Sequence, residues 1–272
     1  ELLDWLAVEL IENDWNLKSL IRQIVQSATY RQSSNLGDDP RKLLETDPEN
    51  RLLARAERFR MPAWMIRDSV LQASQLLDTT VGGPPVRPYQ PSGVWADITM
   101  GRFKYKPSQG DAQFRRTVYT FWRRSAAPAF LFDNAKRRVC QVTTPITNTP
   151  LHALTLMNDL TYLESSRVLA QNAATAFTTR PEQINYIYEH LLSRRPNKAE
   201  LGVILMQLDA LEVFYRSNPE QARRYLRHGQ PESIPTFAKW GTTTGEQNAT
   251  SLAALSSITS MVMNLDETIT RE

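Results

Sequence analysis

The spacing of apolar residues along the chain is mainly helical at its start. Leucines and isoleucines recur three and four positions apart in residues 1–12 and again from Leu17 onward, where Asn16 is placed to cap the second helix. The same spacing returns in residues 62–77, which begin with a proline suited to a helix start. These patterns predict a helical segment over residues 1–79.

The middle of the chain has a different character. Residues 81–95, VGGPPVRPYQPSGVW, are crowded with proline and glycine, which predicts an extended, turn-rich loop. Residues 116–122, RTVYTFW, are rich in β-branched and aromatic types and predict a strand, and 139–144, VCQVTT, predict a second one. We therefore expect a small β-hairpin or sheet and a Pro/Gly-rich loop insertion within residues 80–146.

Helical spacing returns in the last part of the chain, and a capping box is expected at Asn197 and Glu200. The predicted helices cover residues 150–174, 181–192, 198–216, 219–227 and 246–264. At the first of them, Thr149 is expected as N-cap with a proline after it, and the apolar side chains of Leu151, Leu154 and Met157 are expected to turn inward.

Together these elements predict a mainly α fold in one domain over residues 1–272, helical in 1–79, loop- and strand-rich in 80–146, and helical in 147–272. Because the chain opens within an amphipathic helix, we expect it to be a fragment of a longer protein. It contains no apolar run long enough for a membrane span and no signal peptide.

Charge and cysteine content narrow the function classes. The formal net charge is +3 and the pI about 9.0, so the chain is only mildly basic and a nucleic-acid partner is not favoured. The single cysteine, Cys140, excludes an intrachain disulfide, a cysteine-rich zinc site and a CxxCH haem attachment. No cofactor is therefore expected in this chain.

The other familiar sites are not visible in the sequence. His152, His190 and His228 are far apart and lack metal-ligand spacing, so no metal site is expected. No phosphate-binding glycine motif and no nucleophile elbow occurs. Residues 102–124 hold seven basic and six aromatic residues with one acid. This segment suits stacking and phosphate or sugar binding, or else an ordinary core with solvated arginines.

Seven sequence blocks in order resemble one known family. They are ELLDWLAVELIE, SATYRQSS, DPENRLLARAERFRMPAWMIRDSVL, GGPPVRPYQPSGVW, YTFWRR, TNTPLHALTLMND and NLDETITRE. The chain resembles the planctomycete-type C-terminal domain called PSD, domain of unknown function 1553, over essentially its whole length. The resemblance carries over no catalytic residue, because the activity of the family is not established.

The resemblance implies the kind of protein in which this domain occurs. Such proteins are large and extracytoplasmic or secreted, with a cytochrome c-like module upstream, so any haem c would belong to that missing module. The partners implied are the upstream domains of the same polypeptide. The signature residues that match the family are Arg67, Asp68, Tyr89, Trp95, Tyr119, Trp122, Asn148, Thr149, Asn158 and Asp159. The family usually has glutamine where this chain has His152, which argues against a base at that position.

Two functions of different class follow. The first is a structural or interaction module of a secreted, cytochrome c-linked multidomain protein. The second is a polysaccharide-acting hydrolase or redox-associated enzyme, with a site near residues 82–115 and 148–159. Its candidate residues are Arg67, Asp68, Tyr89, Trp95 and Asn148. An aromatic cleft holding a carboxylate pair would favour the enzyme, and a filled, hydrogen-bonded junction would favour the module.

Overall fold

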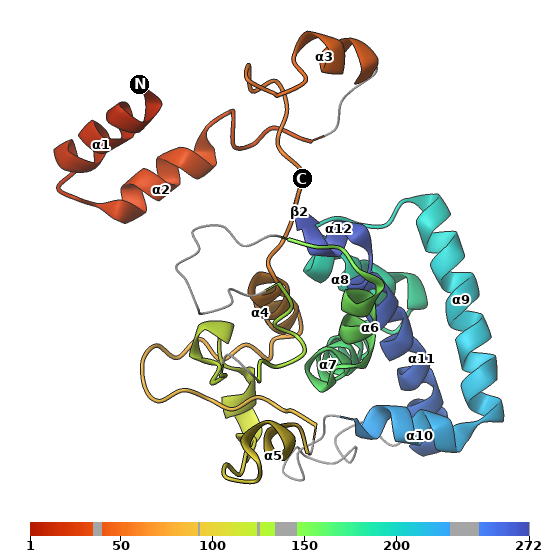
Figure 1. Cartoon of the computed structure of the whole chain (residues 1–272). Helices are drawn as coiled ribbons and strands as arrows, with labels where there is room; N and C mark the ends of the chain where they lie inside the picture. The colour runs from red at the N-terminus through yellow and green to blue at the C-terminus, as the bar shows by residue number, and fades with distance from the viewer. Residues whose placement is uncertain (35–39, 92, 124–125, 134–145, 229–244, 272) are drawn as a thin grey trace. The chain divides into compact units, whose positions relative to one another are not determined.

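A computed structural model of the chain describes residues 1–34, 40–91, 93–123, 126–133, 146–228 and 245–271 (Figure 1). These residues form two compact units, one of Glu1–Arg60 with Thr270–Glu272 and a second of Met61–Ile269. Within the described residues the structure is mainly helical, which confirms the predicted fold class. A search of the described helices for one long and apolar enough to cross a membrane finds none.

The first unit consists of three helices and a short antiparallel sheet. Asn16 caps the second helix as predicted, since its side chain accepts a hydrogen bond from the Ser19 amide at 3.1 Å. In the sheet, Phe59 pairs with Arg271 and Arg60 with Thr270. The elements are α1 (Leu2–Glu12), α2 (Leu17–Gln26), α3 (Pro40–Thr46), β1 (Phe59–Arg60) and β2 (Thr270–Arg271).

The second unit holds the remaining helices and the main hydrophobic core. Its elements are α4 (Ala63–Ala73), α5 (Val94–Thr99), the 3-10 helices η1 (Gly110–Phe114) and η2 (Thr117–Tyr119), α6 (Pro150–Asn158), α7 (Leu160–Ala176), α8 (Arg180–Leu192), α9 (Lys198–Ser217), α10 (Pro219–Arg227), α11 (Gly245–Met263) and α12 (Asp266–Ile269). The helices of the last third match the predicted ranges closely.

Helix α11 is the centre of this unit, with α7 on one side and α9 on the other in Figure 1. Its buried face carries small residues, among them Ala253, Ala254, Ser256 and Thr259. Small side chains let neighbouring helices approach closely and pack densely. The two buried hydroxyls donate hydrogen bonds to carbonyls one turn earlier in α11, so they remain satisfied inside the core.

The start of α9 confirms the predicted capping box. The Asn197 side chain accepts hydrogen bonds from the amides of Ala199 and Glu200, each at 2.9 Å. The Glu200 carboxylate in turn accepts from the Asn197 amide at 2.7 Å. Three amides that would lack partners at the helix start are thereby paired.

The predicted helix over 150–174 is wrong in one respect, because the chain breaks it at Asp159. Asp159 has an extended backbone, with ψ of 136°, and it ends α6 and caps α7 at the same time. Its carboxylate accepts a hydrogen bond from the Thr161 amide at 2.9 Å. Aspartate competes well for backbone amides outside a helix, which favours a new helix start here.

The predicted inward face of α6 is also wrong. Leu151, Leu154 and Met157 are exposed, and the buried side chains are His152 and Leu156, one turn apart. The ring of His152 stacks on Phe132 with centroids 4.1 Å apart. Because α6 is short, it buries only a narrow stripe, and apolar spacing alone pointed to the wrong one.

No strand forms over 116–122, so that prediction is wrong as well. Thr117–Tyr119 is a turn of 3-10 helix, and residues 116–122 take part in an isolated bridge between Val86 and Thr120. In it the Val86 amide donates to the Tyr119 carbonyl at 2.8 Å and the Phe121 amide donates to the Val86 carbonyl at 2.7 Å. The small sheet lies instead in the first unit, outside residues 80–146. The second predicted strand, 139–144 with Cys140, lies outside the described residues.

Candidate functional site

Arg67 on α4 is the centre of a buried polar cluster in the second unit, with only 1% of its surface exposed. Its Nη1 donates to the Arg115 carbonyl and to Thr117 Oγ1, both at 3.0 Å, and its Nη2 donates to the Gln113 carbonyl at 2.7 Å. The guanidinium also lies 4.9 Å from the ring centroid of Phe130. Because a buried charge needs such partners, Arg67 holds the segment around η2 against α4.

Asp68, the next residue, holds the same segment from its other side. Its Oδ1 accepts from the Thr117 amide at 2.9 Å and from Thr117 Oγ1 at 2.5 Å, and it lies 3.6 Å from Arg67 Nη1. Thr117 Oγ1 thus accepts from the arginine and donates to the aspartate. Within the part of the chain that the structure describes, Oδ2 of Asp68 has no hydrogen-bond partner and remains an open acceptor.

Asp159 and Tyr162, at the start of α7, complete the surroundings of Arg67. Burial raises the pKa of Asp159, while the hydrogen bond from Thr161 and the positive charge of Arg67 oppose that rise. Burial also raises the pKa of Tyr162, and the negative charge of Asp159 adds to the effect. For Arg67, burial lowers the pKa, and Asp68, Tyr162 and Asp159 oppose the shift. The cluster is therefore one electrostatically coupled group.

Beside this cluster lies an open pocket of about 570 Å³, which we call the tryptophan pocket. Residues from α4, from η2 and from the segments after η2 line it: Trp64, Asp68, Arg116, Thr117, Val118, Trp122 and Leu131. Trp64 is 47% exposed although most of α4 is buried, and it shares a helix face with Asp68 one turn later.

The chemistry of the tryptophan pocket is mixed. Two indoles and two aliphatic side chains give it apolar walls, and the free oxygen of Asp68 gives it a hydrogen-bond acceptor. Arg116 is exposed and makes no ion pair or hydrogen bond through its side chain within the described residues. Apolar walls with a few fixed polar groups are typical of small-molecule sites, and pockets of this volume suit ligands of one or two rings.

A second pocket of about 590 Å³ holds two other predicted residues, Tyr89 and Trp95, and we call it the glutamine pocket. Its lining is Tyr89, Gln90, Pro91, Gly93, Trp95, Ala96, Gly101, Phe103, Lys104, Tyr105 and Pro107. Trp95 is buried, and its indole Nε1 donates to Gln90 Oε1. The predicted site residues are therefore divided between two pockets.

The other predicted site residues line none of these pockets. Tyr119 braces the loop by accepting a hydrogen bond on its hydroxyl from the Gly82 amide at 2.7 Å, while its ring stacks under Arg115. Asn148 and Thr149 are exposed before α6, and Asn158 donates to the Leu154 carbonyl at 2.7 Å at its end. Thr149 is the N-cap by position, but its side chain makes no capping bond.

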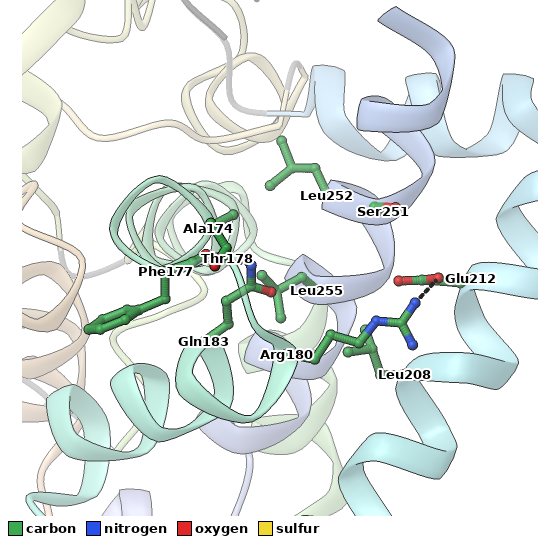
Figure 2. Close-up of a pocket in the computed structure, with 10 residues that line it drawn as sticks. All are labelled: Ala174, Phe177, Thr178, Arg180, Gln183, Leu208, Glu212, Ser251, Leu252 and Leu255. Atoms are coloured by element: carbon green, nitrogen blue, oxygen red, sulfur yellow. Dashed lines mark hydrogen bonds and ion pairs between the residues drawn. The ribbon is translucent and has the colours of Figure 1, made fainter. Parts of the chain in front are cut away.

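A third pocket of about 470 Å³ lies among α7, α8, α9 and α11 (Figure 2). Arg180 reaches across it to Glu212 with an N–O distance of 2.6 Å, and it also pairs with Asp209. Arg216 donates to the same Glu212 carboxylate at 2.7 Å. Because two arginines are matched by two acids, this cluster joins α8 to α9, and it offers a ligand little unpaired charge.

Sequence reasoning did not assign Trp64, Arg116, Gln90 or Tyr162 to a site. One signal was available: Trp64 and Asp68 are four residues apart in a predicted helix and so share a face. The other three come from separate segments and carried no such signal. Among the described residues, no group of three or more histidine, cysteine, aspartate or glutamate side chains is arranged to hold a metal ion.

Comparison with known proteins gives one result. Searches of curated proteins and of solved structures find no match to the chain. The model of the family PSD1, described as "Protein of unknown function (DUF1553)", matches residues 1–208, about three quarters of the chain. The match confirms the family named from the sequence blocks and covers six of the seven, since NLDETITRE lies beyond residue 208, and the chain belongs to the DUF1553 family.

Proposed function

We propose that this chain is a non-catalytic interaction module that binds a polysaccharide in the tryptophan pocket. The observation that carries the proposal is the exposed Trp64 beside the open Oδ2 of Asp68. One face of a sugar ring consists of C–H groups, which pack against an indole, while its hydroxyls donate to a carboxylate. Arg116 would supply hydrogen bonds to ring or glycosidic oxygens.

The rigidity of the pocket supports a binding role. Asp68 is fixed by two hydrogen bonds from Thr117, and Thr117 is fixed in turn by the buried Arg67. A ligand therefore meets a carboxylate whose position is already set, which reduces the entropy lost on binding. In this reading Arg67 has a supporting role and does not itself touch the ligand.

The placement of acids favours binding over hydrolysis. Glycoside hydrolysis generally needs two carboxyl groups, one on each side of the scissile bond. Among the described lining residues of the tryptophan pocket, Asp68 is the one carboxylate, and Asp159, the N-cap of α7, is not one of them. Both terminal nitrogens of Arg67 donate hydrogen bonds to acceptors within the protein, which supports a structural and interaction module.

We further propose that the module serves a secreted, cytochrome c-linked multidomain protein, with its upstream domains as partners. Membership of the DUF1553 family supports this context. The full-length gene product should carry a CxxCH motif upstream and show a haem c absorption spectrum. A cytosolic, haem-free product would overturn the context and leave the proposed sugar binding unaffected.

Sugar binding is tested first with a glycan array and then by calorimetric titration of the positive oligosaccharides. We expect Trp64→Ala to weaken binding at least tenfold, about 1.4 kcal/mol, because the ligand loses its stacking surface. Trp64→Phe should retain part of the affinity. Trp5→Ala is the matched control, since Trp5 also lies on a helix with similar exposure, 51%, and lines none of the three pockets.

Two results would refute the proposed function, and a third would refute the proposed pocket. One is the absence of binding to any glycan by the wild-type chain. The other is release of new reducing ends on long incubation, abolished by Asp68→Asn, which would make the chain a hydrolase. An equal loss of affinity in Trp5→Ala and Trp64→Ala would also place the binding surface outside the tryptophan pocket.

A further inference from the structure

We propose that the glutamine pocket is a second binding site, which takes a carboxylate-bearing ring of an acidic saccharide. The proposal rests on the proposed sugar binding for its class of ligand, but it concerns different residues. The pocket contains Tyr89, Gln90 and Lys104, and none of these residues lines the tryptophan pocket.

The walls of the glutamine pocket are formed by packed aromatic rings. Trp95 and Tyr105 stack with ring centroids 5.0 Å apart and an angle of 11°, and Phe103 packs against the same indole at 5.0 Å. Tyr89 is 40% exposed and supplies the accessible ring. A sugar ring can therefore stack on the exposed ring of Tyr89, while the rings of Phe103 and Tyr105 pack against that of Trp95.

The decisive polar group is the side-chain amide of Gln90, which is buried. Its Oε1 accepts from Trp95 Nε1, and this bond fixes which end of the amide carries the donor. The Nε2 is then left without a partner among the described residues. This nitrogen is itself shielded from solvent, so a ligand oxygen pairs with it only after displacing the side chains that cover it, and that pairing would relieve the cost of a buried donor without a partner.

The charges around the glutamine pocket favour an anion. Lys104 lines the pocket, is exposed, and makes no ion pair within the described residues. Arg87 lies 5.7 Å and Arg123 4.9 Å from the ring centroid of Phe103. No carboxylate is among the lining residues that the structure describes. An amide donor beside cations selects a carboxylate over a neutral hydroxyl.

The Tyr105 side chain carries no negative charge that would repel a bound anion. Burial raises the pKa of Tyr105 to about 12, with the positive charge of Arg87 opposing the rise. Its hydroxyl donates to the Pro88 carbonyl at 2.5 Å. The ring thus stays neutral at physiological pH, and its proton is already used inside the protein.

The same features favour a saccharide over single-stranded nucleic acid. Nucleic-acid grooves stack successive bases on several exposed rings along a strongly basic track. Here Trp95 is buried, Tyr89 is the most exposed ring in the pocket, and the chain has a net charge of only +3. A site for one ring, with the Gln90 amide as donor and Lys104 as cation, matches one acidic sugar unit better than it matches a run of stacked bases.

The experiment compares oligogalacturonate with cello-oligosaccharide of equal length by calorimetric titration of the whole chain. We expect at least tenfold tighter binding of the acidic oligomer, and this preference should shrink as salt is raised. Gln90→Glu keeps an oxygen for Trp95 but replaces the donor with a second anionic oxygen, and it should abolish the preference. Lys104→Gln, at the surface, should reduce it several-fold, while Lys106→Gln, exposed and outside the pocket, should not.

Each other outcome counts against the proposal. Equal affinity for both oligomers overturns it while the proposed function stands, and absence of all binding overturns both. A preference that survives Gln90→Glu and Lys104→Gln places the anion elsewhere. Tighter binding of a sulfated oligomer than of the uronate would reject the carboxylate as the preferred anion. Binding of oligothymidine that is lost in Gln90→Glu would replace the saccharide by nucleic acid.

Discussion

Replacement of Arg67 by lysine tests whether the cluster depends on a forked guanidinium or only on a positive charge. The guanidinium uses two nitrogens to reach acceptors on Gln113, Arg115 and Thr117. Lysine keeps the charge but concentrates its donors on one nitrogen, which cannot span all three acceptors. At least one buried carbonyl therefore loses its partner.

The magnitude follows from these contacts. A buried acceptor left without a partner costs about 1–3 kcal/mol, and loss of the guanidinium from the Phe130 ring adds about 0.5–2 kcal/mol. We expect Arg67→Lys to reduce the free energy of unfolding by about 3 kcal/mol. For a unit of this size, that loss corresponds to a Tm lower by about 10 °C.

The assay is urea unfolding followed by circular dichroism, with a thermal melt as the second measurement. Arg116→Lys is the matched control, since Arg116 is exposed and unpaired within the described residues, and its change should stay within about 0.5 kcal/mol. If Arg67→Lys costs no more than Arg116→Lys, the hydrogen bonds of the guanidinium do not hold the η2 segment, and the reasoning fails.

Two further predictions concern α7. The hydroxyl of Tyr162 is buried without a partner among the described residues, so Tyr162→Phe should leave the free energy of unfolding unchanged or raise it by up to about 1 kcal/mol in urea unfolding. Burial raises the pKa of Glu164 to about 7 from its ordinary 4.5, with Arg167 opposing the shift. The folded protein therefore binds the proton of Glu164 more tightly than the unfolded chain does. The stability contributed by this proton is fully present below pH about 4.5, and about 3 kcal/mol of it should be lost as pH rises to about 7. The difference in stability between Glu164→Gln and wild type, measured from pH about 4 to about 8, isolates this contribution.

Opposite results would be informative in each case. A loss of more than about 1 kcal/mol in Tyr162→Phe would mean that the hydroxyl has a partner after all, such as an internal water. A stability difference between Glu164→Gln and wild type that does not change with pH would mean that Glu164 titrates near its ordinary value, and that the Arg167 charge compensates its burial.

Local chemistry explains which elements were predictable. The starts of α2 and α9 depend on Asn16 and on the reciprocal bonds of Asn197 and Glu200, all within four residues of one another in each case. A proline after Asn218 fits the first position of α10 in the same way. Such starts need no information from the rest of the chain, and they were found at the expected places.

The failures have a common cause, which is competition from distant residues. The segment 116–122 has strand-forming side chains, but two residues about fifty positions earlier take backbone groups that a strand would need. Asp68 accepts from the Thr117 amide, and Arg67 donates to the Arg115 carbonyl next to the segment. In α6 the inward face was decided by the ring of Phe132 against His152. Propensity is a weak guide where such tertiary contacts exist.

The sequence by itself determined the helical class, the capped helix starts at Asn16 and Asn197, and the family. Those features depend on spacings of four residues or less, or on motifs that stand in order along the chain. Only the tertiary structure brought Arg67 close enough to Asp159 for the charge of each to shift the pKa of the other. Only the tertiary structure buried the Gln90 amide nitrogen without a partner among the described residues. Burial and pairing of polar groups depend on which distant segments come together, and local residue spacing does not carry that information.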